Sequence, residues 1–122
     1  MRLTEITYGT AKAIDGYGPG FFRVDGHVLR GPCLITPWDA GPWGGLSDTE
    51  TPLSLAGRID VLFLGMGSEI AHPPAAFRTL LEASGIGVEV MNSPAACRTY
   101  NVLLSEGRRI AAALLPVTSV KG

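Results

Sequence analysis

The chain has 122 residues, 46% of them hydrophobic and 17% charged, which provides for one sizeable core but not for two independent ones. Ten basic and eleven acidic residues leave a formal net charge of −1, without the clustered positive excess of a nucleic-acid-binding surface. We therefore expect a single domain over residues 1–122 that has no nucleic-acid partner and folds without a metal or cofactor.

The N-terminal segment predicts neither export nor membrane anchoring. Charged residues interrupt it, so it lacks the apolar centre of a signal peptide. No apolar run in the chain approaches the roughly 20 residues that span a bilayer. The two cysteines, Cys33 and Cys97, form no C-x-x-C motif and no disulfide framework. A cytoplasmic protein without stable membrane insertion is expected.

The first half of the chain indicates strands. Leu3, Ile6 and Tyr8 begin a loosely alternating segment, which residues 11–17 continue toward a Gly-Pro-Gly turn. Residues 21–24 and 27–30 flank an Asp-Gly pair, a strong hairpin signal because both central turn positions favour positive φ. A short strand over 33–36 follows and ends at a proline.

Residues 37–52 form a predicted loop rich in glycine and proline that contains Trp38 and Trp43. Two interpretations of these tryptophans stay open. They cover the core, as tryptophans usually do, or they form an exposed aromatic surface for a partner.

The second half changes its hydrophobic period. The apolar run 61–64 is typical of a strand covered on both faces. A helix is predicted over 73–84, a strand over 87–91, a helix over 94–106 with Ser93 as its N-cap, and a closing strand over 110–117. The order predicts an α/β fold in three layers, with helices on a central mixed sheet and an N-terminal antiparallel β-hairpin layer alongside.

Two features are candidates for chemistry. Gly65 and Gly67 follow the apolar strand, where α/β sheets bind ligands, but the spacing fits no dinucleotide motif, and a tight turn is the favoured explanation. Cys97 lies near a helix N-terminus beside Arg98, which favours a thiolate, yet a helical wheel places it on the buried edge. Neither a zinc ligand set nor a nucleophile elbow is present.

The segment 91–114 contains the run A-A-C-R-T-Y-N followed by L-x-x-E-G-R. It resembles the most distinctive block of a family with bacterial and archaeal members long catalogued as domains of unknown function. Animal members of that family include mitochondrial respiratory complex I assembly factor 3 and an adipogenesis-associated domain protein. Segments 18–21 and 62–67 also fit, so the resemblance spans nearly the whole chain.

The resemblance implies a three-layer fold with a mixed five-stranded central sheet, no established enzyme activity and no established cofactor. It also implies an accessory role in which the protein binds a partner protein during biogenesis. The candidate functional surface carried over from the family comprises Arg98, Asn101, Glu106 and Arg108 together with the turn from Gly65 to Gly67.

The sequence therefore leaves three alternative functions. The first is a non-catalytic accessory protein that binds a protein partner, with Arg98 and the tryptophans as candidate contacts. The second is an enzyme or small-ligand binder with a pocket near Gly65, Gly67, Cys97 and Arg98. The third is a structural subunit of a larger assembly.

Overall fold

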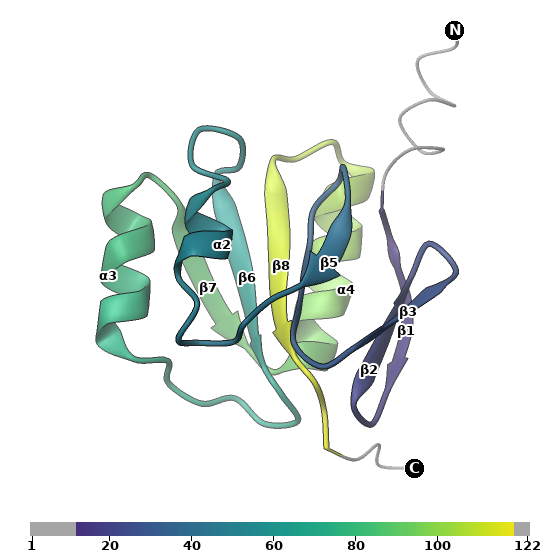
Figure 1. Ribbon diagram of the computed structural model, residues 1–122. Helices are drawn as coiled ribbons and strands as arrows, with labels where there is room; N and C mark the ends of the chain where they lie inside the picture. Colours follow the sequence, from purple (N-terminus) through teal and green to yellow (C-terminus); the bar gives the residue numbers. More distant parts are fainter. Residues whose placement is uncertain (1–11, 119–122) are drawn as a thin grey trace, which may run out of the picture.

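A mixed five-stranded sheet forms the centre of the computed structural model, which describes residues 12–118 (Figure 1). Its strand order is β5-β4-β8-β6-β7. Strands β6, β7 and β8 are parallel to one another, whereas β4 is antiparallel to both β8 and β5. The strands are β4 (Cys33–Ile35), β5 (Ala40–Pro42), β6 (Val61–Met66), β7 (Gly87–Met91) and β8 (Ile110–Leu115).

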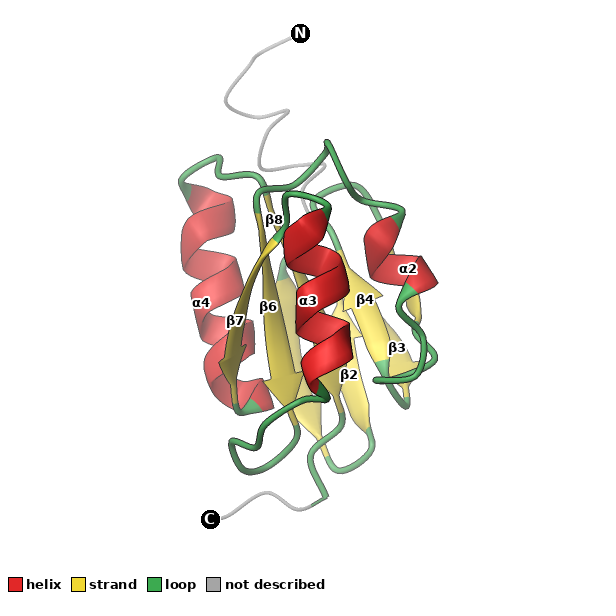
Figure 2. Cartoon of the chain, turned by 90° about the vertical axis from the view of Figure 1, so that its left-hand side faces the viewer, coloured by secondary structure: helices red, strands yellow, loops and turns green. Residues whose placement is uncertain are grey.

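Helices cover both faces of this sheet. The short α2 (Glu50–Leu53) and α3 (Ala75–Ala83) lie on one face, and α4 (Ser93–Ser105) lies on the other (Figure 2). The apolar strand β6 explains the arrangement, because its successive side chains enter opposite cores. Leu62 and Leu64 pack with Phe77 and Leu81 of α3, while Phe63 packs with α4.

A smaller antiparallel sheet lies on the same side as α4. It consists of β1 (Ile14–Gly18), β2 (Phe21–Val24) and β3 (His27–Arg30) in that order. The predicted hairpin turn is confirmed: Asp25 has φ 52° and Gly26 has φ 80°, as a two-residue hairpin turn requires. Phe22 and Val24 of β2 are buried in the same cluster as Tyr100 of α4. The predicted three-layer α/β fold with its five-stranded mixed sheet is therefore confirmed.

Three details of the sequence prediction are wrong. The first long helix begins at Ala75, after two prolines, and not at residue 73. The N-cap of α4 is Asn92, whose side chain accepts a hydrogen bond from the Ala95 N–H at 2.8 Å, so Ser93 is already helical. The predicted loop 37–52 contains β5 and most of α2. The alternating segment with Leu3, Ile6, Tyr8 and Ala11 lies outside the described residues.

Candidate functional site

The carboxyl ends of β6, β7 and β8 lie at one edge of the sheet, where open α/β sheets commonly bind ligands. Here the side chain of Ser93 occupies that edge. Its hydroxyl donates to the Leu115 carbonyl at 2.6 Å and accepts from the Gly67 N–H at 2.9 Å. The Ser93 N–H donates to the Gly67 carbonyl at 2.8 Å. Ser93 is fully buried. The first turn of α4 therefore fills the space at the carboxyl ends of β6 and β8, where a ligand would otherwise bind.

The two glycines of the predicted pocket, Gly65 and Gly67, lie where α4 packs against the end of β6. A Cβ atom added to Gly65 would lie 2.7 Å from Ser93 Oγ and 2.8 Å from Ser93 Cα. Gly67 has φ 96°, in the left-handed region that favours glycine. The structure thus explains Gly65 by the close approach of α4 to β6 and Gly67 by its left-handed φ, and both residues are buried.

Cys97 lies one turn further along α4, on its buried side. Its side chain belongs to the cluster between α4, the central sheet and the small sheet, and the residue is 5% exposed. Burial raises the pKa of the Cys97 thiol to about 12, although the neighbouring Arg98 opposes this effect. Burial likewise raises the pKa of Cys33, in the same cluster, to about 12. Both thiols are protonated at neutral pH, so neither has the thiolate character of a nucleophile.

Tyr100 and Asn101 of the same motif attach α4 to β1 and to the segment before it. The Ile14 N–H donates to Asn101 Oδ1 at 2.9 Å, and Asn101 Nδ2 donates to the Ile14 carbonyl at 2.8 Å. The Tyr100 hydroxyl donates to the Lys12 carbonyl at 2.8 Å. Tyr100 is fully buried, and burial raises the pKa of its phenol. The Cys-Arg-Thr-Tyr-Asn run thus presents one side to the interior of the molecule.

Arg98, Glu106 and Arg108 point to solvent. Arg98 borders a shallow, mainly apolar hollow with Val102, which is 56% exposed. Glu106 follows the last turn of α4, where its N–H donates to the Leu103 carbonyl at 3.1 Å. The structure therefore does not bring Arg98 into one pocket with Gly65 and the Cys97 thiol, because the guanidinium is exposed and the other two groups are buried.

The two tryptophans have different environments. Trp43 is 4% exposed and packs at a ring-centroid distance of 6.0 Å from Phe77. Its indole N–H donates to the Asp48 carbonyl at 2.8 Å. The interpretation of Trp43 as an exposed partner surface is therefore wrong, and this residue covers the core. Trp38 is 45% exposed and remains available at the surface.

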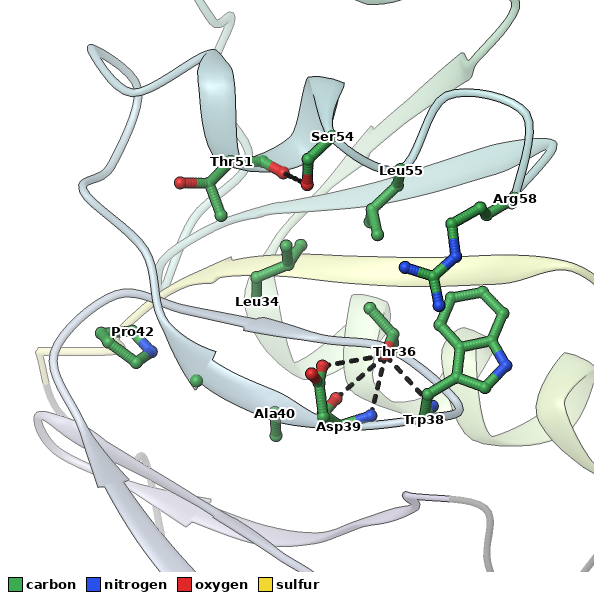
Figure 3. Close-up of a pocket in the computed structure, with 11 residues that line it drawn as sticks. Leu34, Thr36, Trp38, Asp39, Ala40, Pro42, Thr51, Ser54, Leu55 and Arg58 are labelled. Atoms are coloured by element: carbon green, nitrogen blue, oxygen red, sulfur yellow. Dashed lines mark hydrogen bonds between the residues drawn. The ribbon is translucent and has the colours of Figure 1, made fainter.

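Trp38 lies beside a hollow of about 230 Å³ between α2 and the β4–β5 hairpin (Figure 3). The Arg58 guanidinium carbon lies 4.2 Å from the centroid of the Trp38 ring, a cation–π contact. Asp39 lines the same hollow, and its carboxylate accepts a hydrogen bond from the Thr36 hydroxyl at 3.2 Å. We call this the α2-side hollow.

Arg58, Asp39 and Thr51, which line the α2-side hollow, were not predicted from the sequence as site residues. They come from separate parts of the chain, and the short strand β5, which lines one side of the hollow, has the sequence Ala-Gly-Pro. These residue types are depleted in strands. The only signal present in the sequence was Trp38 within a Gly- and Pro-rich loop.

Neither a metal site nor a membrane span is found within residues 12–118. No three His, Cys, Asp or Glu side chains of this range are grouped as metal ligands would be. None of the helices between these bounds has the length and apolar character needed to cross a bilayer.

Comparison with known proteins relates this geometry to a family. Residues 14–115 match the family described as protein of unknown function (DUF498/DUF598). An uncharacterized protein of Rhodobacter capsulatus is 52% identical over 117 residues, which are 96% of this chain and 94% of the relative. NADH dehydrogenase (ubiquinone) 1 alpha subcomplex assembly factor 3 of Danio rerio is 37% identical over 119 residues, or 92% of this chain and 67% of the relative. The human protein of that name is 34% identical, with 95% and 67% covered.

Solved structures share the fold. A crystal structure of a Bordetella parapertussis protein superimposes with a TM-score of 0.78 at 30% identity, covering 88% of this chain and 97% of the other. That of an outer membrane protein from Bartonella henselae gives a TM-score of 0.79 at 35% identity, with 88% and 96% covered. A solution structure from Bordetella pertussis, an Mth938-like domain, gives 0.72 at 26% identity, with 89% of each chain covered.

Proposed function

Because the chain belongs to the DUF498/DUF598 family, we propose that it is a non-catalytic accessory protein that binds a protein partner during assembly of a respiratory or other membrane-associated complex. The observation that carries this proposal is the 37% identity to assembly factor 3 of Danio rerio, which extends over 92% of this chain. The family match over residues 14–115 includes both sheets and the three helices of the described residues, so the similarity to the family covers the described fold and not an isolated motif.

The environment of the motif residues supports a binding role over a catalytic one. Asn101, Tyr100 and Ser93 use their polar groups to join elements of the protein itself. The thiols are buried and protonated. The groups left at the surface, Arg98 among them, are of the kinds that recognise partner proteins.

The experiment is deletion of the gene in its organism of origin, with the wild-type chain restored from a plasmid as the control. Blue-native electrophoresis with NADH dehydrogenase activity staining would measure the amount of fully assembled complex I. We expect a loss of the assembled complex, accumulation of smaller subcomplexes, and recovery on complementation. An unchanged amount of assembled complex I in the deletion strain would contradict the role in respiratory assembly.

The surface contacts are tested in the same strain. Arg98→Glu reverses an exposed charge without touching the core, so the protein should fold normally and complement poorly. Asn101, Glu106 and Arg108 were expected on the same surface, but the Asn101 side chain faces β1, and its loss should act through stability instead. Equal complementation by the wild type and Arg98→Glu would remove Arg98 from the binding surface.

A further inference from the structure

Strand β5 is an edge of the five-stranded sheet, and its outward backbone groups follow from the register. The Thr36 N–H bonds to the Asp39 carbonyl, and the Trp43 N–H bonds to the Pro32 carbonyl. Antiparallel pairs alternate between bonded and non-bonded, so the Leu34–Gly41 pair between them is bonded as well. The N–H and C=O of Ala40 therefore point away from β4, as does the C=O of Pro42.

These groups have no partner strand. No hydrogen bond joins the Ala40 backbone to any other element among the described residues, and β5 is the last strand in the sheet order. Pro42 has no N–H, as is usual for a proline on an edge strand. The edge thus offers one donor and two acceptors over three residues, a short template for an added strand.

A hollow lies on each side of this edge. The α2-side hollow contains Trp38 and Arg58 (Figure 3). A second one, of about 470 Å³, lies toward the small sheet and contains Val28 and Leu29; we call it the hairpin-side hollow. Asp39 and Ala40 line both. An added strand would place successive side chains alternately into the two hollows, because strand side chains point to opposite faces.

The chemistry of the two hollows differs. In the α2-side hollow, the Arg58 guanidinium is stacked on Trp38, and its N–H groups take part in no hydrogen bond or ion pair within residues 12–118. Stacked guanidinium groups with free donors bind carboxylates well. The Asp39 carboxylate also lines this hollow, but it accepts its hydrogen bond from the Thr36 hydroxyl and forms no ion pair with Arg58. The hairpin-side hollow has Lys12, Asp25, His27 and Asp39 at its margins, but Val28, which is 47% exposed, and Leu29 form an apolar part next to Ala40 that suits an apolar side chain.

We propose that the β5 edge binds an extended segment of a partner protein, in which an apolar residue pairs with Ala40 over the hairpin-side hollow and an adjacent acidic residue reaches Arg58. The proposal rests on the proposed function only in taking the partner to be a protein. The Ala40 side chain faces the hairpin-side hollow. The residue of the bound segment that pairs with Ala40 therefore faces the same hollow and is apolar, and the residues on either side of it face the α2-side hollow and are acidic. The missing N–H at Pro42 limits pairing to a short segment and disfavours edge-to-edge association of two copies.

The experiment is an NMR titration of the ¹⁵N-labelled full chain with a capped seven-residue peptide in which valine alternates with glutamate. A peptide with lysine in place of glutamate tests the charge requirement. A third peptide, methylated on the backbone nitrogen of its central valine, tests the strand pairing. We expect the Ala40 amide signal to shift downfield and saturate with the first peptide, and to respond at least about tenfold more weakly to the other two.

Two variants and a control locate the binding site. Arg58→Gln should weaken binding of the glutamate peptide about tenfold and should not weaken binding of the lysine peptide, which loses a repulsive charge. Gly41→Val should place a side chain in the α2-side hollow, which Gly41 lines, and so block it. The variant should still fold, because an added Cβ meets nothing within 4 Å and φ is not positive. Gly16→Val is the matched control, since Gly16 in β1 is equally unobstructed. It should bind like the wild type.

The proposal is overturned if the Ala40 signal does not move, or if the lysine peptide binds as well as the glutamate peptide. Gly41-sensitive dimerisation in sedimentation experiments would also overturn it, because the occupant would then be a second copy. Complementation separates this result from the proposed function. Full rescue of complex assembly by Gly41→Val would refute partner binding at the β5 edge and would not contradict the accessory role. Peptide binding in a protein whose deletion has no assembly phenotype would support the edge and refute that role.

Discussion

The side-chain amide of Asn101 pairs with the backbone of Ile14 in both directions, as a neighbouring strand would. The Ile14 N–H donates to Oδ1 at 2.9 Å, and Nδ2 donates to the Ile14 carbonyl at 2.8 Å. Strand β1 has an irregular register at this point, between Ile14 and Gly16. A single helical side chain therefore completes the hydrogen bonds of an edge strand and fixes the small sheet to α4.

Replacement of Asn101 by alanine removes both hydrogen bonds and should destabilise the protein by about 2 kcal/mol. Urea unfolding followed by circular dichroism would measure this change. Val102→Ala is the control, because Val102 is exposed beside Asn101 and its truncation should cost less than about 0.5 kcal/mol. Equal urea midpoints for Asn101→Ala and Val102→Ala would mean that the pairing contributes nothing to stability.

The substitution Gly65→Ala should destabilise the protein by about 2 kcal/mol or more, because its Cβ would overlap with the backbone of α4. The nearest atoms would be Ser93 Oγ at 2.7 Å and Ser93 Cα at 2.8 Å. Gly41→Ala is the matched control, since the space around its added Cβ is open. Thermal unfolding of both variants is the measurement. A Gly65→Ala protein as stable as Gly41→Ala would show that α4 does not need this close approach.

Alkylation by iodoacetamide should be slow at Cys33 and Cys97 while the protein is folded. Burial raises the pKa of each thiol from 9.0 to about 12. The raised folded-state pKa means that stability is fully present below pH 9 and decreases as the pH rises toward 12. In this window each thiol should lower stability by up to about 1.4 kcal/mol per pH unit.

One measurement is the alkylation rate at pH 8 with and without urea. The other is a set of urea unfolding curves at pH values from 8 to about 12. Cys97→Ala provides the reference, since it should show a weaker decrease of stability at alkaline pH. Rapid alkylation of the native protein at pH 8 would revive the nucleophile hypothesis for Cys97.

Acid should loosen the segment that carries Trp43. The Thr51 hydroxyl, followed by the Gly44 and Thr51 N–H groups, lowers the pKa of Asp48 below 3.8. A lowered pKa means that the carboxylate contributes stability above its usual pKa, and that this contribution is lost as the pH falls through the lowered value. The Trp43 indole, bonded to the Asp48 carbonyl, should report the change by fluorescence.

Asp48→Asn should show a weaker acid dependence of the unfolding free energy than the wild type, because the titrating group is gone. A Trp38→Phe background isolates the Trp43 signal. Parallel acid dependence in the wild type and Asp48→Asn would assign the effect to other carboxylates.

The order of elements was predictable from the sequence because the strong signals are local. The Asp25-Gly26 turn, the apolar run of β6 and the proline before α3 each depend on a few adjacent residues. The N-cap of α4 was not predictable. Asn92 and Ser93 are equally good cap residues, and the choice depends on the bonds of Ser93 to Gly67 and Leu115, which lie far away in the sequence.

The same distinction applies to the candidate site. The buried edge of α4 at Cys97 followed from helical periodicity alone. That the Asn101 amide turns inward depends on Ile14, 87 positions away, and periodicity contains no such information. Strand β5 was invisible because its Ala-Gly-Pro sequence has no strand preference. Strand β5 forms because β4 provides a template for pairing. The two hollows beside β5 could therefore be recognised only in the three-dimensional structure.

Strand β8 is the last strand in the described chain, yet it lies in the middle of the five-stranded sheet. During translation the β4–β5 and β6–β7 ribbons leave the ribosome first, and no ladder joins them until β8 enters between β4 and β6. Tyr100 and Asn101, which fasten the N-terminal sheet, also emerge late. A nascent chain that stops short of residue 110 therefore consists of unlinked ribbons with open apolar faces, and the five-stranded sheet can close only after β8 has emerged.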